Sequence, residues 1–243
     1  MSGTHGSSLT ILALLMAFAL IHSGGAALRD RAEAIVGPRV WRLIFSVLSI
    51  PSVVILIGYF LAHRHDGIRL WNLQGMPGMV PFVWIGTAVS FLFLYPATFR
   101  LLEIPALLQP KVRLYDGGII RISRHPQAVG QLLWCLTHTL WLGTSFALAT
   151  SCGLMVHHCF AVWHGDRRMA SRFGEAFEQL RATTSVIPFA AVLDGRQQLH
   201  WQEFFRPAYL GIAIAVGVFW WSHRFIDLAG LAFSQGPLGS WLH

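Results

Sequence analysis

Long hydrophobic runs, separated by short polar stretches, dominate the pattern along this chain. Six of these runs are long enough, or nearly so, to cross the roughly 30 Å of hydrocarbon in a bilayer. We expect helices over these runs, at 9–28, 40–62, 80–96, 127–144, 146–164 and 208–223. The fourth and fifth runs are separated only by Gly143-Thr144-Ser145, which predicts a tight hairpin. The fold class predicted is an all-α integral membrane protein, a polytopic bundle of about six transmembrane helices forming one domain over 1–243.

Composition and charge agree with this prediction. Of 243 residues, 54% are hydrophobic and 12% are charged, whereas a soluble domain has about 25% charged residues. The predicted loops at 29–42, 97–126 and 165–206 contain fifteen of the 18 Lys and Arg residues. The positive-inside rule then places these loops in the cytoplasm and the N-terminus outside. The net charge of +7 therefore reflects topology and lipid contact, with no nucleic-acid partner. The short polar start of the chain predicts no transit peptide.

Four histidines lie inside the predicted spans, whereas all eleven Asp and Glu residues map to predicted loops. They are His22, His138, His157 and His158. An ionisable side chain at membrane depth is costly, so it indicates a functional site. Imidazole without an acidic partner favours metal or haem ligation over a proton relay.

The depth of three of these histidines is similar. With a rise of about 1.5 Å per residue, His22, His138 and His157 lie roughly 9–12 Å inside the cytoplasmic edge. Two such imidazoles could clamp a flat cofactor through opposite axial positions. Hydrogen bonding between neighbouring helices explains the same residues equally well, so the sequence leaves both interpretations open.

A polar stripe follows the predicted helix at 127–144. Gln127, Gln131, Trp134 or Cys135, and His138 recur at helical spacing. Cys135 lies three residues before His138, so the two are expected on one face of the helix.

The remaining cysteines and histidines carry weaker signals. Cys152 and Cys159 are expected as small core residues, and an odd cysteine count without C-x-x-C-H argues against disulfides and covalently attached haem. His63 is expected as an interfacial anchor. In Arg124-His125-Pro126, proline favours the first turn of a helix, where exposed N–H groups and His125 are suited to an anionic group.

Several long segments of the chain resemble the NnrU family, in particular its carotene-isomerising branch. Together they cover most of residues 22–206, whereas the C-terminal helix at 208–223 carries little of the resemblance. The matching segments are His22-Ser23-Gly24, HRHDGIRLWNLQG at 63–75, FLYPATFRLLEI at 93–104, RISRHPQAVGQLLWCLTHTLWLG at 121–143, HHCFAVWHGDRRMASRFGEAFEQL at 157–180 and TTSVIPFAAVLDGRQ at 183–197.

The resemblance implies a haem b protein that converts 9,15,9'-tri-cis-zeta-carotene to the 9,9'-di-cis isomer. The reaction has no net redox change and needs ferrous haem. The resemblance implies His22 and His138 as axial ligands of the iron, with Cys135 as an alternative ligand, and these three residues as catalytic. Arg124, His125 and His157 are candidate cofactor contacts, and the role of His63 stays open.

The same resemblance implies the surroundings of the protein. It places the chain in a cyanobacterial-type plasma or thylakoid membrane, in contact with the bilayer and its zeta-carotene substrate. An unidentified electron donor and neighbouring carotenoid-pathway enzymes are further expected partners.

Two alternatives from other classes remain. A non-catalytic accessory membrane protein of denitrification fits the same family. The segments RHPQ and GDRRMASRFGEAFEQLRATTSVIPF are also similar to isoprenylcysteine and phospholipid methyltransferases. Those enzymes usually have an acidic pair where Asp166-Arg167 lies here, and this difference counts against a methyltransferase.

Overall fold

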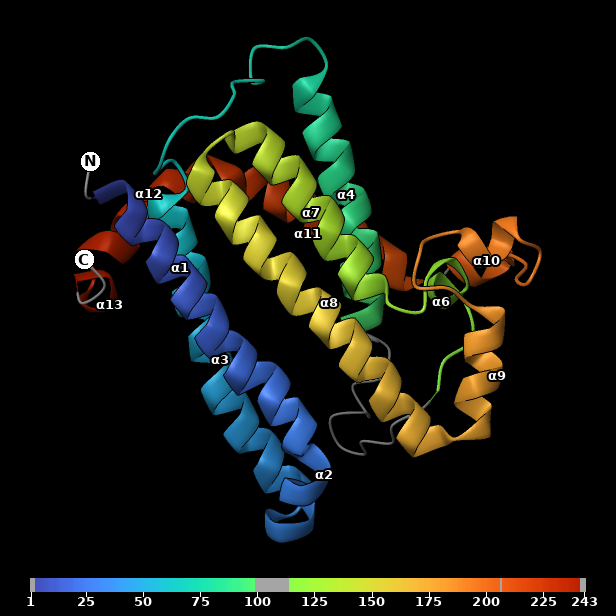
Figure 1. The fold of residues 1–243 in the computed structure, drawn as a ribbon. Helices are drawn as coiled ribbons and strands as arrows, with labels where there is room; N and C mark the ends of the chain where they lie inside the picture. The colour runs from blue at the N-terminus through green and yellow to red at the C-terminus, as the bar shows by residue number, and fades with distance from the viewer. Residues whose placement is uncertain (1–2, 99–113, 206, 241–243) are drawn as a thin grey trace. The chain divides into compact units, whose positions relative to one another are not determined.

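The structure is a computed structural model, and it describes residues 3–98, 114–205 and 207–240. Within these ranges the chain is helical, apart from loops and one isolated β-bridge between Arg69 and Thr144 (Figure 1). The helical elements are α1 (Gly3–Ala19), the π-helical turn η1 (Leu20–Gly24), α2 (Gly25–Val36), α3 (Pro38–His63), α4 (Met79–Thr98), α6 (Ile119–Ile122), α7 (Pro126–Leu142), α8 (Ser145–Phe173), α9 (Glu175–Thr183), α10 (Ala190–Leu193), η2 (Trp201–Phe204), α11 (Pro207–Ser222), η3 (His223–Phe225), α12 (Ile226–Gln235) and α13 (Pro237–Ser240).

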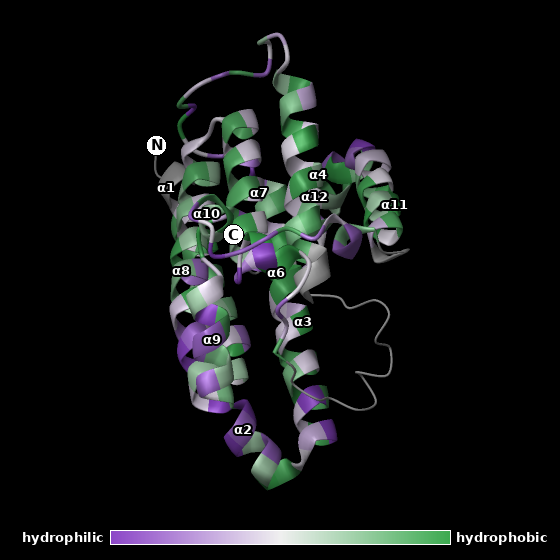
Figure 2. Cartoon of the chain, turned by 90° about the vertical axis from the view of Figure 1, so that its right-hand side faces the viewer, coloured by the Kyte–Doolittle hydropathy of each residue, from purple (hydrophilic) through white to green (hydrophobic). Residues whose placement is uncertain are grey.

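Four of the described helical segments are long and apolar enough to cross a membrane. They are Gly6–Val36, Pro38–His63, Ser145–Phe173 and Tyr209–Gln235. The all-helical fold class with membrane-length apolar helices is therefore confirmed for the described residues, but the count of about six spans is not. The apolar stretch Met79–Leu94 of α4 is shorter, and α7 has only 17 residues. Figure 2 shows how hydrophobic residues cover α3 and α4, whereas α9 is largely hydrophilic.

The chain forms two compact units, each assembled from separate segments. The first unit contains residues 1–75, 139–157 and 222–243, and the second contains 76–138 and 158–221. Helices α7 and α8 each contribute residues to both units. The resemblance segment at 93–104 lies partly outside the described residues.

The first unit packs α1, α3 and α12 together with the start of α8. Its core contains Ile11, Leu56, Tyr59 and Phe146. Small residues allow the close approach of α3 and α12, since a Cβ atom added at Gly230 would lie 2.8 Å from the carbonyl oxygen of Leu61. Close backbone packing at glycine is typical of helix pairs in membranes.

The second unit packs α4 against α7. Ser90 on α4 donates a hydrogen bond of 2.8 Å to the carbonyl oxygen of Gly130 on α7. A Cβ atom at Gly130 would lie 2.7 Å from the carbonyl oxygen of Ser90, so only glycine fits this crossing. A cluster of Phe93, Ile119 and Ile122 extends the core of this unit toward α6.

The predicted hairpin at 143–145 is confirmed. Gly143 has a φ of +63° and separates α7 from α8. The amide of Leu70 donates a 2.7 Å hydrogen bond to the carbonyl oxygen of Gly143, and the Thr144 hydroxyl donates to the carbonyl oxygen of Arg64 at 3.1 Å. The loop after α3 is thereby held against the turn.

One prediction about the carboxylates is wrong. All Asp and Glu residues are expected in loops, but Asp30 and Glu33 lie on α2, Asp166 lies on α8 and Asp227 lies on α12. Helix α8 continues to Phe173. The helix extends beyond its apolar part because 165–173 contains no proline, and its charged side chains find partners.

Candidate functional site

His22 is held by three contacts within the first unit. It lies in η1, between α1 and α2. Its Nδ1 atom is 2.7 Å from the Ser49 hydroxyl on α3. Its ring stacks on Phe18 with centroids 5.1 Å apart and tilts against Phe45 at 5.2 Å. The hydroxyl and the two phenyl rings together define the orientation of the imidazole.

His157 lies close to His22 in the same unit. Its Nε2 atom is 2.8 Å from the hydroxyl of Ser23, and its ring meets Phe18 edge-on with centroids 5.8 Å apart. His22 and Ser23 are adjacent in sequence but contact different helices, α3 and α8. The structure therefore brings together two of the histidines that the sequence placed at similar depth.

The π-helical turn at Leu20–Gly24 was not predicted. It interrupts the run that reads as one continuous span and lies where His22 and Ser23 reach their partners. A π turn accommodates one extra residue and is frequent at functional sites. Glycines at 24 and 25 are the only local signal, and they do not specify a π turn.

His138 belongs to the second unit, where it contacts Trp134. Its Nδ1 atom is 3.0 Å from the Trp134 carbonyl oxygen, and the two rings stack with centroids 4.1 Å apart. A carbonyl oxygen can only accept, so this contact is a hydrogen bond when Nδ1 carries the proton; the Thr137 hydroxyl lies 3.3 Å from the same nitrogen. The neutral ring then has its lone pair on Nε2, the nitrogen through which a histidine with this hydrogen bond binds a metal.

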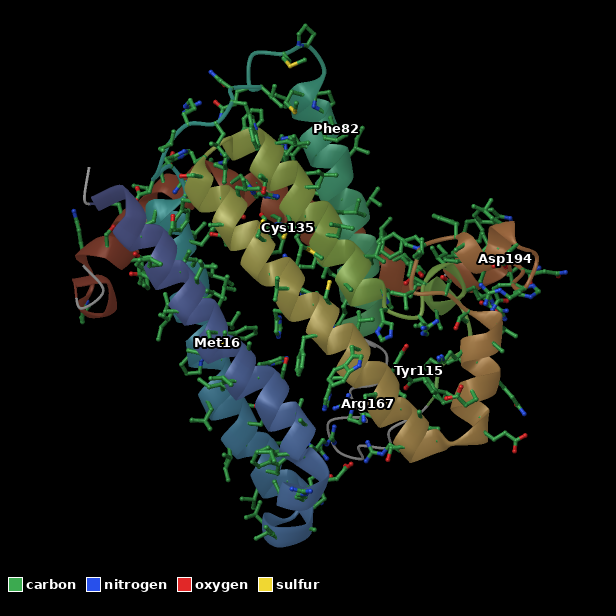
Figure 3. All side chains as sticks on the ribbon, in the orientation of Figure 1. Met16, Phe82, Tyr115, Cys135, Arg167 and Asp194 are labelled. Carbon is green, nitrogen blue, oxygen red and sulfur yellow. The ribbon has the colours of Figure 1, made fainter. Side chains whose placement is uncertain are left out.

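Cys135 is buried in the second unit, with 3% of its surface exposed (Figure 3). Its sulfur accepts a hydrogen bond of 3.5 Å from the Gln131 amide, so this part of the predicted polar stripe is confirmed. Cys152 and Cys159 are exposed instead of buried, and their prediction as core residues is wrong. They lie on outward faces of α8, where a small apolar side chain is compatible with lipid.

Arg124 and His125 contact Asp166 at the start of α7. The Arg124 guanidinium donates to Asp166 Oδ2 at 2.8 Å, and His125 Nε2 lies 2.6 Å from Asp166 Oδ1. Burial lowers the pKa of His125, although the hydrogen bond to Asp166 acts in the opposite direction. A neutral His125 therefore donates its Nε2 proton to the carboxylate. The anionic group expected beside His125 is a side chain of the protein itself.

A second ion pair joins α6 to η2, and sequence reasoning missed it. The Arg121 guanidinium donates to Glu203 at 2.9 and 3.0 Å and to Gln197 at 2.8 Å. The Gly118 amide also donates to Glu203. Arg121 in particular lowers the pKa of Glu203 to about 2. Eighty-two residues separate the partners, and no sequence periodicity links them.

His63 is more than an interfacial anchor. Its Nδ1 atom is 2.8 Å from Asp66 Oδ2, and its ring stacks on Tyr59 with centroids 4.2 Å apart. Because His63 and Asp66 are only three residues apart, this pair could have been predicted from the sequence.

A bare metal ion and a haem require different ligand sets from a protein. In the described part of the chain, no three His, Cys, Asp or Glu side chains converge as a side-chain metal site requires. A haem needs only axial ligands from the protein. His22 and His138 each have Nδ1 beside an oxygen atom, an arrangement typical of metal-bound histidine, and so does His63 beside Asp66.

Comparison with known proteins identifies one matching family and two similar plant proteins. The family model described as "NnrU protein" matches residues 10–229. A protein of Zea mays named "15-cis-zeta-carotene isomerase, chloroplastic" is 52% identical over 207 residues, covering 84% of this chain and 57% of its own length. A protein of Arabidopsis thaliana with the same name is 50% identical over 213 residues, covering 86% of this chain and 58% of its own length.

The chain thus spans somewhat more than half the length of these curated relatives. No solved structure gives a significant match. Because the family model extends over nearly all of the helical chain, from the first span to α12, this protein belongs to the NnrU family.

Proposed function

We propose that the protein is a haem-dependent isomerase that converts 9,15,9'-tri-cis-zeta-carotene to the 9,9'-di-cis isomer. About half of its residues are identical to those of two proteins named 15-cis-zeta-carotene isomerase. The cofactor proposal is supported by His22 and His138, which lie on apolar helical segments and each have Nδ1 beside an oxygen atom.

The proposed chemistry suits a hydrocarbon substrate. A carotene has no heteroatom to protonate and no leaving group, so general acid–base catalysis has little to act on. Ferrous haem iron would supply electron density or Lewis acidity that lowers the order of one double bond. The apolar helices around the histidines would dissolve the polyene and exclude water.

Each candidate residue has a role in this proposal. His22 and His138 would bind the haem iron, and Cys135, three residues before His138 on α7, would be the alternative ligand. His157 holds η1 through Ser23. Arg124 and His125 fix the start of α7 through Asp166, so their effect on the cofactor is exerted through the helix that bears His138.

The proposed setting is a membrane, as the four long apolar helices indicate. The plant relatives carry the word chloroplastic in their names. The basic loops at 29–42 and 165–206 would face the cytoplasm or stroma, where an electron donor could reach the protein.

Dark-grown bacteria engineered to accumulate tri-cis-zeta-carotene test the function, since light isomerises the same bond. We expect chromatography to show the di-cis isomer only when the chain is present. His138→Ala should abolish conversion, whereas His164→Ala, a matched histidine on α8, should retain it. An unchanged 15-cis pool with haem bound and reductant present would contradict the proposal and favour the accessory role.

A methyltransferase is less well supported. Asp166, at the position where those enzymes usually have an acidic pair, contacts Arg124 and His125. Transfer of a labelled methyl group to an added isoprenyl thiol, lost in Arg124→Ala, would favour that alternative.

A further inference from the structure

We infer that Ser49 and Phe45 on α3 position His22 for iron binding. In this assignment, the Ser49 hydroxyl accepts a hydrogen bond from His22 Nδ1–H, and Phe45 restricts the rotation of the ring. The inference rests on the proposed function only in taking His22 as an iron ligand. Neither side chain touches the iron or the carotene, so both are positioning residues.

The geometry places both contacts on one face of α3. Phe45 and Ser49 are four residues apart, which puts them one above the other on a helix. The Ser49 hydroxyl is 2.7 Å from His22 Nδ1, and the Phe45 ring centroid is 5.2 Å from that of His22. Ser49 is buried, with 7% of its surface exposed. A buried hydroxyl inside an apolar helix needs a partner, and His22 is that partner.

The hydrogen bond selects the nitrogen that can bind iron. When Nδ1–H donates to Ser49, the lone pair of the neutral imidazole lies on Nε2. Without an acceptor, a protonated Nδ1 in apolar surroundings would be unsatisfied, which is unfavourable. The acceptor also increases electron density on the imidazole, and this favours ferric over ferrous iron. Ser49 therefore sets both the strength of ligation and the reduction potential.

Ser52 provides a matched control on the same helix. Its hydroxyl donates to the backbone carbonyl of Ser49 at 2.7 Å. This is a local bond within α3, and it does not reach His22. Replacing Ser52 removes a half-buried hydroxyl of the same size from the same helix, without changing the partner of His22.

The experiment compares Ser49→Ala, Ser49→Cys, Ser49→Thr and Ser52→Ala in the full chain purified with haem. Two readouts are used: the rate of haem transfer to apomyoglobin, and the reduction potential from spectroelectrochemical titration. In Ser49→Ala we expect haem affinity about 10- to 100-fold weaker and a higher reduction potential. Ser49→Thr, which keeps the hydroxyl, and Ser52→Ala should match the unmodified chain.

Ser49→Cys keeps the volume but is a weaker acceptor, so its potential should lie between those of Ser49→Ala and the unmodified chain. If Ser49→Ala does not fold, Ser49→Cys alone tests whether Ser49 positions His22. Unchanged affinity and potential in Ser49→Cys and Ser49→Ala would overturn the inference. An unmodified chain that binds no haem would instead overturn the proposed function, so the two failures are distinguishable.

Discussion

At the scale of the residue, the bonded nitrogen distinguishes the histidines within the helices. His22 and His138 both have Nδ1 beside an oxygen atom, whereas His157 has Nε2 beside the Ser23 hydroxyl. Histidines that look equivalent in a hydropathy plot therefore differ in the ring nitrogen that lies beside an oxygen atom. This difference predicts that the first two ligate iron and that the third supports the turn that bears His22.

His22→Ala and His138→Ala should each lose most of the bound haem, because an axial bond disappears. His157→Ala should retain haem, because it removes a hydrogen bond to Ser23 instead of a ligand. The pyridine haemochrome assay on equal amounts of purified protein measures the difference, with His164→Ala as the control. Loss of haem in His157→Ala equal to that in His22→Ala would contradict this assignment.

Cys135→Ala should retain haem but change the ferrous absorption spectrum, because the thiol is the alternative ligand in the proposed function. The comparison requires reduced and oxidised spectra of the purified protein. Cys152→Ala is the control, since that cysteine is exposed on α8. A Cys135→Ala spectrum identical in both redox states would exclude ligand exchange and leave histidine ligation intact.

At the scale of the element, turns and helix crossings depend on single small residues. Gly143 joins α7 to α8, and Gly130 allows α4 and α7 to approach. The sequence predicts the turn at 143–145 because glycine there separates two apolar runs. The sequence does not predict the helix crossing at Gly130, because the residues next to a helical glycine do not indicate which helix packs against it.

Gly143→Ala should destabilise the protein. The residue has a positive φ, and a Cβ atom would lie 2.1 Å from the carbonyl oxygen of Trp71. Backbone strain of this kind costs about 1–3 kcal/mol before the clash is added. Thermal unfolding in detergent should show a lower midpoint than for Gly217→Ala on α11, where no atom lies within 4 Å of the added methyl group. Equal midpoints would contradict the close packing of this turn.

The ion pair between Arg121 and Glu203 predicts a local response to acid. The folded pKa of Glu203 is about 2, below its ordinary value of 4.5. Its stabilising contribution is therefore complete above pH 4.5 and is lost as the pH falls toward about 2. The protection factors of the amides at 118–122, which correct for the intrinsic pH dependence of exchange, should fall over this range, and Glu203→Gln should lower them already at neutral pH.

Glu178→Gln is the control for that measurement, since Glu178 pairs with Arg181 at an exposed site. Protection factors at 118–122 that are independent of both pH and Glu203 would show that the pair does not hold α6.

At the scale of the whole molecule, the basic residues gather at the polar ends of the long helices. The basic residues predicted in loops lie partly on helices, because α2 and α8 continue past their apolar sections into polar ones (Figure 2). The uneven distribution of Arg and Lys still predicts one orientation.

Reporter fusions test that orientation. Alkaline phosphatase, which is active only outside the cytoplasm, should be active when fused after Gly75 and inactive when fused after Gln198. A green fluorescent protein fused at the same two positions should give the opposite pattern. Reversed activities would contradict the positive-inside assignment and place the basic loops outside.

The sequence by itself determined the helical membrane class, the turn at Gly143 and the histidines worth testing. These follow from local properties: hydropathy over about twenty residues, a glycine between two runs, and imidazole where charge is costly. The number of spans was less well determined, because α7 falls just short of the length that defines a span.

Only the tertiary structure decided which atoms the candidate residues contact. Ser49 lies 27 residues from His22, and Ser23 lies 134 residues from His157. Asp166 is likewise more than forty residues from Arg124 and His125. Hydropathy does not encode such pairs, because each side chain alone fits its helix equally well with another partner. The packing of α1, α3 and α8 selects the partner, and with it the nitrogen that His22 can offer to iron.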